Sequence, residues 1–269
     1  MNMEKSFRIT VIMGIYNCAE TLIEALESLE AQTYKQFKVI LCNDGSNDST
    51  LEIAKSWASI HHNYIVIENP QNLGLNATLN HCLKYADTEF IARMDGDDRS
   101  LPNRFEQEVK FLDNHPEYAI VSGPMYYFDE YGVFKKGKGK GEITKLDFIA
   151  GSPFCHAPCM VRREAYEKVK GYTVDSKLLR VEDYHLWFKM YAAGFKGYML
   201  ESPIYEMRDA REARSRRTFK SRLNEAYVKH IGYKMIGLPW WCQIYCIVPI
   251  IKGLLPMWLY KWLHRYEVK

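Results

Sequence analysis

The stretch that most constrains this chain is Phe-Ile-Ala-Arg-Met-Asp-Gly-Asp-Asp, residues 90–98. Four of its first five residues are apolar or β-prone, and residues 90–94 predict a buried strand. Three carboxylates, those of Asp95, Asp97 and Asp98, follow within four residues, where that strand leaves the sheet. Ligand sites of open α/β sheets lie at the carboxyl ends of strands, and crowded carboxylates repel one another unless a cation neutralises them. The stretch therefore predicts a site for Mg²⁺ or Mn²⁺, and the alternative is an acidic turn in which Asp98 caps the next helix.

Strand and helix patterns alternate through the first hundred residues. Apolar strand patterns occur four times, and amphipathic helix patterns occur three times between them. This β-α-β-α order predicts an α/β fold with a parallel, doubly wound sheet, because each helix returns the chain to the same end of the sheet. The predicted strands are residues 7–15, 37–42, 64–68 and 90–94, and the predicted helices are residues 19–31, 49–59 and 74–85.

Polar residues follow three of these predicted strands. Tyr16 and Asn17 follow the first strand, residues 43–46 (Asn-Asp-Gly-Ser) follow the second, and the acid triplet follows the fourth. Because the carboxyl ends of parallel strands meet at one edge of a sheet, all three loops are expected on the same edge. Their convergence predicts an active cleft there.

The pattern is looser after residue 102. We expect a helix that reaches residue 112, strands at residues 119–123 and 125–128, a short helix from Arg163 and a helix over residues 182–193. Residues 132–141 contain four lysines and four glycines. This composition predicts a mobile, basic loop.

The C-terminal part of the chain has a different composition. Residues 235–251 contain no charged residue, but prolines interrupt the apolar run, which is shorter than the about 20 residues that a spanning helix needs. Aromatic side chains flanked by lysines suit the headgroup zone of a bilayer. We therefore expect attachment to a membrane surface, with a true span or burial against the protein's own body as alternatives. The aromatic residues concerned are Trp240, Trp241, Tyr245, Trp258, Tyr260 and Trp262.

The overall composition is that of a folded protein, with 47% hydrophobic and 26% charged residues. The formal net charge of +3 does not point to nucleic acid as a partner. The seven cysteines show no Cys-x-x-Cys pair and no zinc spacing, which indicates free thiols in a reducing compartment. The short, polar N-terminus shows no secretory signal peptide, so a cytoplasmic location is expected.

Five motifs now form an ordered set: residues 12–17 (Ile-Met-Gly-Ile-Tyr-Asn), 43–49 (Asn-Asp-Gly-Ser-Asn-Asp-Ser), 72–74 (Asn-Leu-Gly), 94–98 (Met-Asp-Gly-Asp-Asp) and 181–187 (Val-Glu-Asp-Tyr-His-Leu-Trp). In this order and spacing the chain resembles the family 2 inverting glycosyltransferases with a GT-A fold, of the kind that build bacterial surface polysaccharides. The resemblance covers residues 7–207. It implies a catalytic domain over residues 1–207, with a nucleotide-sugar-binding half (1–101) and an acceptor half (102–207). Residues 208–269 are then a basic and aromatic helical extension that associates with the membrane.

The resemblance implies roles on the donor side. Asp44 would read the nucleotide by accepting the N3–H of uracil, and Gly45 would allow the sharp turn beside it. Asp95 and Asp97 match the family's Asp-x-Asp element, which implies Asp97 as the direct metal ligand and Asp95 nearer to the ribose. Read alone, residues 43–46 are also a generic loop, and residues 72–74 are either a helix start whose amides face the nucleotide or a plain turn. The implied donor-binding residues are Tyr16, Asn17, Asp44, Gly45, Asn72, Gly74, Asp95 and Arg208.

On the acceptor side, Asp183 matches the family's catalytic base and Glu182 a residue that orients the acceptor. Two acids at a helix start are otherwise a common, dipole-favoured N-terminus. His156 matches a third metal ligand or a diphosphate contact, with a core histidine as the alternative. Arg208 matches only in part, because residues 209–211 (Asp-Ala-Arg) stand where the family's pattern has a histidine.

The implied activity is transfer of a sugar with inversion from a nucleotide-diphosphate donor, expected to be a UDP-sugar, with help from Mn²⁺ or Mg²⁺. The expected acceptor is a hydroxyl of a growing, lipid-linked surface glycan (O-antigen, lipooligosaccharide or capsule) at the inner face of a bacterial cytoplasmic membrane. Two other interpretations are a non-catalytic, transferase-like membrane scaffold and a sugar nucleotidyltransferase. A scaffold needs neither Asp97 nor Asp183, and a nucleotidyltransferase would carry a Gly-rich basic loop near the N-terminus, which is absent before Asp44.

Overall fold

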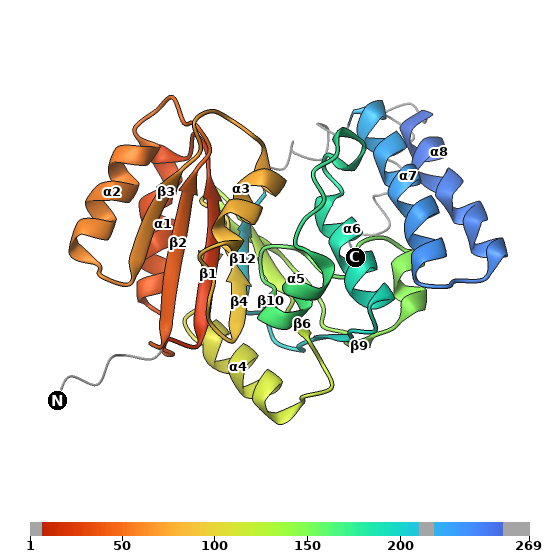
Figure 1. The fold of residues 1–269 in the computed structure, drawn as a ribbon, viewed down its shortest axis with the longest axis horizontal. Coiled ribbons are helices and arrows are strands. Elements are labelled where there is room, and N and C mark those ends of the chain that lie inside the picture. Colours follow the sequence, from red (N-terminus) through yellow and green to blue (C-terminus); the bar gives the residue numbers. More distant parts are fainter. Residues whose placement is uncertain (1–6, 210–217, 255–269) are drawn as a thin grey trace.

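The computed structural model describes residues 7–209 and 218–254, and its central feature is an eight-stranded sheet (Figure 1). The first four strands are parallel and stand in the order β3-β2-β1-β4. All four strands and three helices predicted for this region are confirmed, with small shifts at their ends. They are β1 (Ile9–Ile15), α1 (Ala19–Glu30), β2 (Phe37–Asn43), α2 (Thr50–Ile60), β3 (Tyr64–Glu68), α3 (Leu75–Leu83) and β4 (Phe90–Arg93).

Strand β1 lies at the point where the strand order reverses. Its partners are β2 on one side and β4 on the other, and ligand sites of open α/β sheets lie at the carboxyl edge beside such a point. Alternate residues of β1 enter the two hydrophobic cores: Ile12 lies in one, and Val11 and Met13 lie in the other. Burial on both faces explains why the predicted strands read as nearly continuous apolar runs.

Beyond β4 the sheet becomes mixed. Strand β10 (Met160–Arg162) is antiparallel to both β4 and β6 (Ile120–Ser122), β11 (Gly197–Met199) is parallel to β6, and β9 (Gly141–Ile143) forms the antiparallel edge. The predicted parallel, doubly wound arrangement therefore holds for the first half of the sheet only. Residues of α3, α5 (Arg163–Val169) and α6 (Glu182–Ala192) share one core, and residues of α1 and α4 (Arg104–Asn114) share the other.

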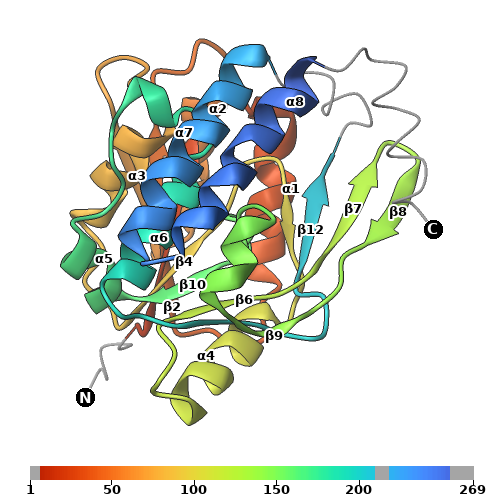
Figure 2. The ribbon, with the colours of Figure 1, turned by 90° about the vertical axis from the view of Figure 1, so that its right-hand side faces the viewer.

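A second, four-stranded sheet stands beside the first, in the order β5-β12-β7-β8 (Figure 2). Strand β5 (Arg99–Ser100) follows the acid triplet directly, and β12 (Tyr205–Arg208) lies between β5 and β7 (Met125–Asp129). The prediction of a loop over residues 132–141 is wrong for residues 132–136, which form strand β8 (Gly132–Lys136), and for residue 141, which begins β9. Residues 137–140 between the two strands form no helix or strand. Two lysines of β8 lie over tyrosine rings of β7, Lys135 at 4.9 Å from the Tyr127 ring and Lys136 at 5.9 Å from the Tyr126 ring, and these contacts hold the hairpin together.

The C-terminal helices pack beside α6 (Figure 1). Helix α7 (Phe219–Met235) contributes Val228 and Tyr233 to the core that α6 shares, and η4 (Trp240–Ile247) and α8 (Val248–Leu254) lie against α7. Within residues 7–209 and 218–254, no helix is both long and apolar enough to cross a bilayer. The predicted domain boundary at residue 207 stays a prediction, and Trp258, Tyr260 and Trp262 lie outside the described residues.

Candidate functional site

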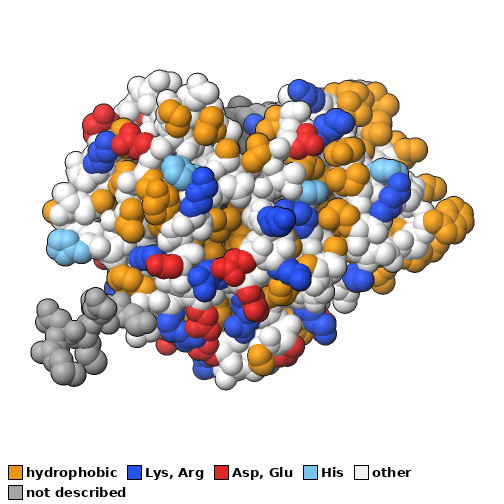
Figure 3. All heavy atoms as spheres, viewed as in Figure 1, with side chains coloured by type: hydrophobic (Ala, Val, Ile, Leu, Met, Phe, Trp, Pro, Cys, Tyr) orange, Lys and Arg blue, Asp and Glu red, His pale blue; other side chains and the backbone are white. Residues whose placement is uncertain are grey.

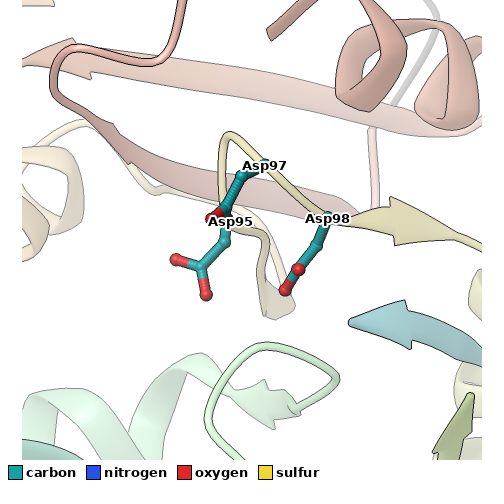
Figure 4. Close-up of side chains that lie close together, drawn as sticks. All are labelled: Asp95, Asp97 and Asp98. Carbon is teal, nitrogen blue, oxygen red and sulfur yellow. The ribbon is translucent and has the colours of Figure 1, made fainter. Parts of the chain in front are cut away.

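The acid triplet forms a compact cluster at the carboxyl end of β4. Carboxylate oxygens of Asp95, Asp97 and Asp98 all lie within 4.8 Å of one another, and Figure 4 shows the three side chains leaving one short loop. Asp98 is buried, Asp95 is partly buried and Asp97 is exposed. Oxygen ligands at this spacing fit a hard divalent cation, so the predicted metal site has the donor set that it needs.

The three acids of the cluster differ in how the surrounding protein contacts them. Asp95 forms a bidentate ion pair with Arg93, and its carboxylate accepts a 2.5 Å hydrogen bond from Nη1 of that arginine. Asp98 accepts a 2.7 Å hydrogen bond from the backbone amide of Arg208. Among the described residues, Asp97 has no ion-pair partner. The expectation that Asp98 caps the next helix is wrong, because Asn103 occupies the N-cap position of α4.

The electrostatics of the cluster favour a cation. Desolvation by the surrounding protein atoms raises the pKa of Asp97, although part of its side chain reaches solvent, and the neighbouring charge of Asp95 raises it further. Burial raises the pKa of Asp98 well above its ordinary value, and the charges of Asp95 and Asp97 act in the same direction. A bound divalent cation would relieve this repulsion between like charges.

A pocket of 590 Å³ opens beside the cluster. It brings together five residues predicted for the donor and metal site, because the loops after β1 and β4 and the end of β12 meet there. Its lining also includes residues that the sequence did not single out, Asp48 and Cys18 among them. The predicted residues in the lining are Tyr16, Asn17, Asp95, Asp97 and Arg208.

Asp44 and Gly45 hold the loop after β2 against the start of α3. The buried carboxylate of Asp44 accepts hydrogen bonds of 2.9 Å from the amides of Leu73 and Gly74 and one of 2.8 Å from the side chain of Asn69. Gly45 has a φ of +71°, and a Cβ there would lie 2.8 Å from the amide nitrogen of Asn72, so only glycine fits. The amides of Leu73 and Gly74, at the start of α3, therefore point at Asp44. The pocket lining does not include Asp44, Gly45, Asn72 or Gly74.

The loop after β2 is joined to the pocket through Asn17. The Asn17 amide donates to the hydroxyl of Ser46 at 3.1 Å, and its side-chain oxygen accepts from the amide of Asn47 at 2.8 Å. Asn17 itself has a φ of +47°, in the left-handed region that few residues adopt. The structure thus connects the motif after β2 to the pocket wall.

Arg208 reaches the pocket from the second sheet. Its Nε donates to the backbone oxygen of Asp97 at 3.0 Å, and its guanidinium pairs with Glu24 and lies 4.5 Å from the centre of the Phe128 ring. The partial motif match at Arg208 is therefore supported by its position.

The second pair of predicted acids begins helix α6. Asp183 is partly buried, and its Oδ2 accepts a 3.2 Å hydrogen bond from Ser152. Burial raises the pKa of Asp183 to about 6, and the neighbouring charge of Glu182 acts in the same direction. A carboxylate with this pKa is mostly ionised at neutral pH and is a better proton acceptor than an ordinary aspartate.

His156 lies apart from the acid cluster. Its Nε2 lies 2.7 Å from the hydroxyl of Tyr172, which in turn lies 3.1 Å from the hydroxyl of Tyr166. Burial lowers the pKa of His156 well below its ordinary value, so the ring is neutral at pH 7. In the described part of the chain the only metal-like grouping of His, Cys, Asp and Glu is the acid triplet, and His156 is not brought into it.

Comparison with known proteins decides the family. The profile described as Glycosyl transferase family 2 matches residues 10–170, which is more than half of the chain. The chain belongs to glycosyltransferase family 2.

Among curated relatives, the putative glycosyltransferase EpsE of Bacillus subtilis is 39% identical over 263 residues, which covers 97% of this chain and 94% of that protein. An Escherichia coli UDP-Gal:alpha-D-GlcNAc-diphosphoundecaprenol beta-1,3-galactosyltransferase is 30% identical over 220 residues, covering 78% of this chain and 77% of that enzyme. The name of the second relative gives a lipid-linked sugar as its acceptor.

Two solved structures share the fold. The crystal structure of Staphylococcus aureus TarS residues 1–349 with UDP-GlcNAc has a TM-score of 0.71 at 19% identity and covers 92% of this chain and 72% of that one. The mannosyltransferase PcManGT of Pyrobaculum calidifontis with GDP-Man and Mn²⁺ has a TM-score of 0.65 at 16% identity and covers 97% and 79%. The expected GT-A fold of this glycosyltransferase is thereby confirmed.

Proposed function

We propose that this family 2 glycosyltransferase transfers a sugar with inversion from a UDP-sugar to a hydroxyl of a lipid-linked glycan. The observation that carries the proposal is the placement of Asp95 and Asp97 of the acid cluster in the wall of the 590 Å³ pocket, together with the partly buried carboxylate of Asp183, which lies outside that lining. A transferase site of this kind needs carboxylates that hold the cation and the donor, and a separate carboxylate that accepts the proton of the acceptor hydroxyl. UDP is proposed because one relative and one solved structure carry UDP-sugars in their names.

Asp97 is the proposed direct ligand of Mn²⁺ or Mg²⁺, because it is the exposed acid without an ion-pair partner among the described residues. Asp95 would then face the ribose, and Tyr16 and Asn17 the remainder of the nucleotide. Arg208 lies in the same wall and carries a positive charge suited to the diphosphate. A divalent cation held there would stabilise the negative charge that develops on the departing nucleoside diphosphate.

Asp183 is the proposed general base. With a pKa raised to about 6 it is ionised at neutral pH and accepts the proton of the acceptor hydroxyl as that oxygen attacks the anomeric carbon. One base on the side opposite the leaving group gives inversion of the anomeric centre. Glu182 precedes Asp183 at the start of α6 and is proposed to orient the acceptor.

The donor half of the proposal is tested with a panel of nucleotide sugars and Mn²⁺, by calorimetric binding and by product analysis with wild type and Asp97→Ala. We expect one UDP-sugar to bind in a metal-dependent way, and Asp97→Ala to lose that binding by roughly a hundredfold because a ligand to the cation is gone. Asp129→Ala, which removes an aspartate of β7 outside the pocket lining, is the control. If no nucleotide sugar binds with any metal, the transferase proposal fails, and a non-catalytic membrane scaffold becomes the favoured interpretation.

The proposed acceptor side includes a membrane surface. Side chains of α7, η4 and α8 expose apolar surface over one lobe of the molecule, at the right of Figure 3. Trp240 is 85% exposed, Ile244 68% and Leu254 70%, and residues 235–254 contain Lys252 and no acidic residue. An apolar, cationic surface of this kind suits the interface of a bilayer with anionic headgroups, where the lipid-linked acceptor lies.

Vesicle sedimentation tests this attachment. A triple Ser variant at Trp240, Ile244 and Leu254 is expected to reduce binding to anionic vesicles about tenfold or more, because apolar surface and its insertion are lost. Ile60→Ser removes an apolar side chain that is 71% exposed on the distant helix α2 and is expected to leave vesicle binding unchanged. Equal binding by wild type and the triple variant would rule out this surface as the attachment site.

A further inference from the structure

An arginine of strand β4 stands directly behind the acid cluster. Arg93 is 4% exposed, although charged side chains are seldom buried without a partner. Both terminal nitrogens of its guanidinium bond to Asp95, and its Nε has no hydrogen-bond partner among the described residues. The cationic group is therefore committed to a single carboxylate.

The backbone of Arg93 is fixed from the other side. Nη2 of the buried Arg104 donates to the Arg93 carbonyl at 3.0 Å and to the carbonyls of Ala157 and Cys159. The amide of Asp95 donates to the hydroxyl of Tyr205 at 3.2 Å. Hydrogen bonds within the protein thus hold the end of β4, the side chain of Arg93 and Asp95 together as one unit.

The same arginine affects carboxylates on both sides of the site. Its charge lowers the pKa of Asp97 and Asp98, and also that of Asp183 at the start of α6. No other fully buried cation of the described residues bonds to a carboxylate of the cluster, since Arg104 pairs with Glu108 instead. Arg93 therefore carries the internal positive charge of this acidic region.

We infer that Arg93 is a positioning residue that holds Asp95 for the nucleotide and keeps it from coordinating the cation, so that Asp97 takes the cation. The inference rests on the proposed function and assigns a residue that acts through Asp95 and does not touch the donor. A bidentate pair engages one lone pair on each oxygen of Asp95 and fixes the direction of its carboxylate, whereas the exposed Asp97 has no ion-pair partner among the described residues. The alternative is an ion pair that serves only the packing of the strand end.

The two explanations predict opposite signs for the binding of Mn²⁺ alone. Removing the buried positive charge in Arg93→Met makes the cluster more negative and frees the oxygens of Asp95. Mn²⁺ without nucleotide should then bind more tightly, by about tenfold, while UDP in the presence of saturating Mn²⁺ should bind about tenfold more weakly because Asp95 is no longer positioned. A purely structural role predicts that both affinities fall or stay the same.

A cycle with Asp95 tests whether the arginine acts through this partner. Asp95→Asn leaves Arg93 with an unpaired charge near Asp97, so Mn²⁺ alone should bind more weakly than in wild type. The double variant Arg93→Met/Asp95→Asn removes both charges together and should bring Mn²⁺ affinity back toward the wild-type value. Arg93→Lys keeps the charge and loses the bidentate geometry, so it should retain Mn²⁺ affinity and lose part of the UDP affinity.

The measurements are Mn²⁺ binding by electron paramagnetic resonance and UDP binding by calorimetry on the full chain, with melting temperatures to confirm folding. Arg162→Met is the matched control, since Arg162 is a largely buried arginine of β10 that bonds to the carbonyls of Leu112 and Tyr118 and should change neither affinity. Unchanged or weaker Mn²⁺ binding in folded Arg93→Met overturns the inference. If wild type binds neither Mn²⁺ nor UDP, the metal-assisted function itself fails, and the inference fails with it. Should Arg93→Met not fold, the other two variants decide the matter: a double variant that does not recover the Mn²⁺ affinity lost in Asp95→Asn, or an Arg93→Lys variant that keeps its full UDP affinity, overturns the inference.

Discussion

The proposed donor side and the proposed acceptor side of the site hold their carboxylates in different ways. On the proposed donor side Asp44 accepts hydrogen bonds from two backbone amides and one side-chain amide, and Asp95 forms a bidentate pair with the buried Arg93. On the acceptor side Asp183 has one side-chain hydrogen bond, of 3.2 Å, from the exposed Ser152. The donor side is therefore preorganised for a charged ligand, whereas the acceptor side leaves its carboxylate free to take a proton.

The difference follows from the chemistry asked of each group. A group that positions a ligand has to stay ionised and in place, which several charge-assisted hydrogen bonds ensure. A general base has to accept a proton in the transition state, and hydrogen bonds to its ionised form would make it a weaker base. At Asp183 partial burial outweighs the hydrogen bonds from Ser152 and from the backbone of Tyr184, and its pKa is raised without fixing its protonation state.

The largest expected effect separates these two roles. Asp183→Asn keeps the shape of the side chain but removes its basicity, so kcat should fall by about 10²–10⁴-fold, while the Kd of UDP with Mn²⁺ stays within about twofold of wild type. The measurement is steady-state transfer to a saccharide acceptor alongside calorimetric UDP binding. Loss of UDP binding together with kcat would place Asp183 on the donor side and contradict its assignment as the general base.

A smaller effect is expected at Asp44, the anchor of the donor loops. Asp44→Asn turns one acceptor oxygen into a donor that faces the amides of Leu73 and Gly74, which should lower the free energy of unfolding by about 1–3 kcal/mol. Urea unfolding measures this loss, and UDP binding should weaken with it. Asp87→Asn is the matched control, because Asp87 is 74% exposed and its ion pair with Lys38 contributes about 1 kcal/mol or less. Equal stability losses in the two variants would show that Asp44 does not brace the loops.

The donor half of the fold could be predicted from sequence because its signals are local. Strands β1 to β4 are apolar runs and helices α1 to α3 have a helical period, so each element is visible without knowledge of its neighbours. Parallel strands also place their carboxyl ends on one edge, which is why Tyr16, Asn17, Asp95 and Asp97 could be expected together. The pocket lining confirms this convergence.

The remaining features depend on contacts between distant segments. Strand β5 is two residues long and pairs with β12 more than a hundred residues later, so neither the second sheet nor the bond from the Arg208 amide to Asp98 has a local signal. The role of Arg93 has no local signal either, because its ion pair with Asp95 and its position behind the acid cluster are visible only in the three-dimensional structure. Residues 132–136 were expected in a loop because lysine and glycine suggest one, but the tyrosines of β7 stabilise them as a strand.

The smallest expected effect tests the acceptor side alone. Because Asp183 has a pKa of about 6 and must be ionised to act as base, kcat of the wild type should fall as the pH drops below about 6 and be nearly flat between pH 7 and 8.

The Ser152 hydrogen bond stabilises the ionised form, so Ser152→Ala should raise the pKa of Asp183 and move the acidic limb of the kcat profile to higher pH. Loss of one partly exposed hydrogen bond, worth about 0.5 kcal/mol, raises the pKa by about 0.4 unit, which corresponds to roughly a 1.5- to 2-fold lower kcat at pH 6 and almost no change at pH 8. Ser59→Ala, on the distant helix α2, should leave the profile unchanged. A uniform loss of kcat at every pH would mean that Ser152 positions the acceptor loop, whereas a limb that moves only at low pH would identify Asp183 as the group that loses its proton before catalysis.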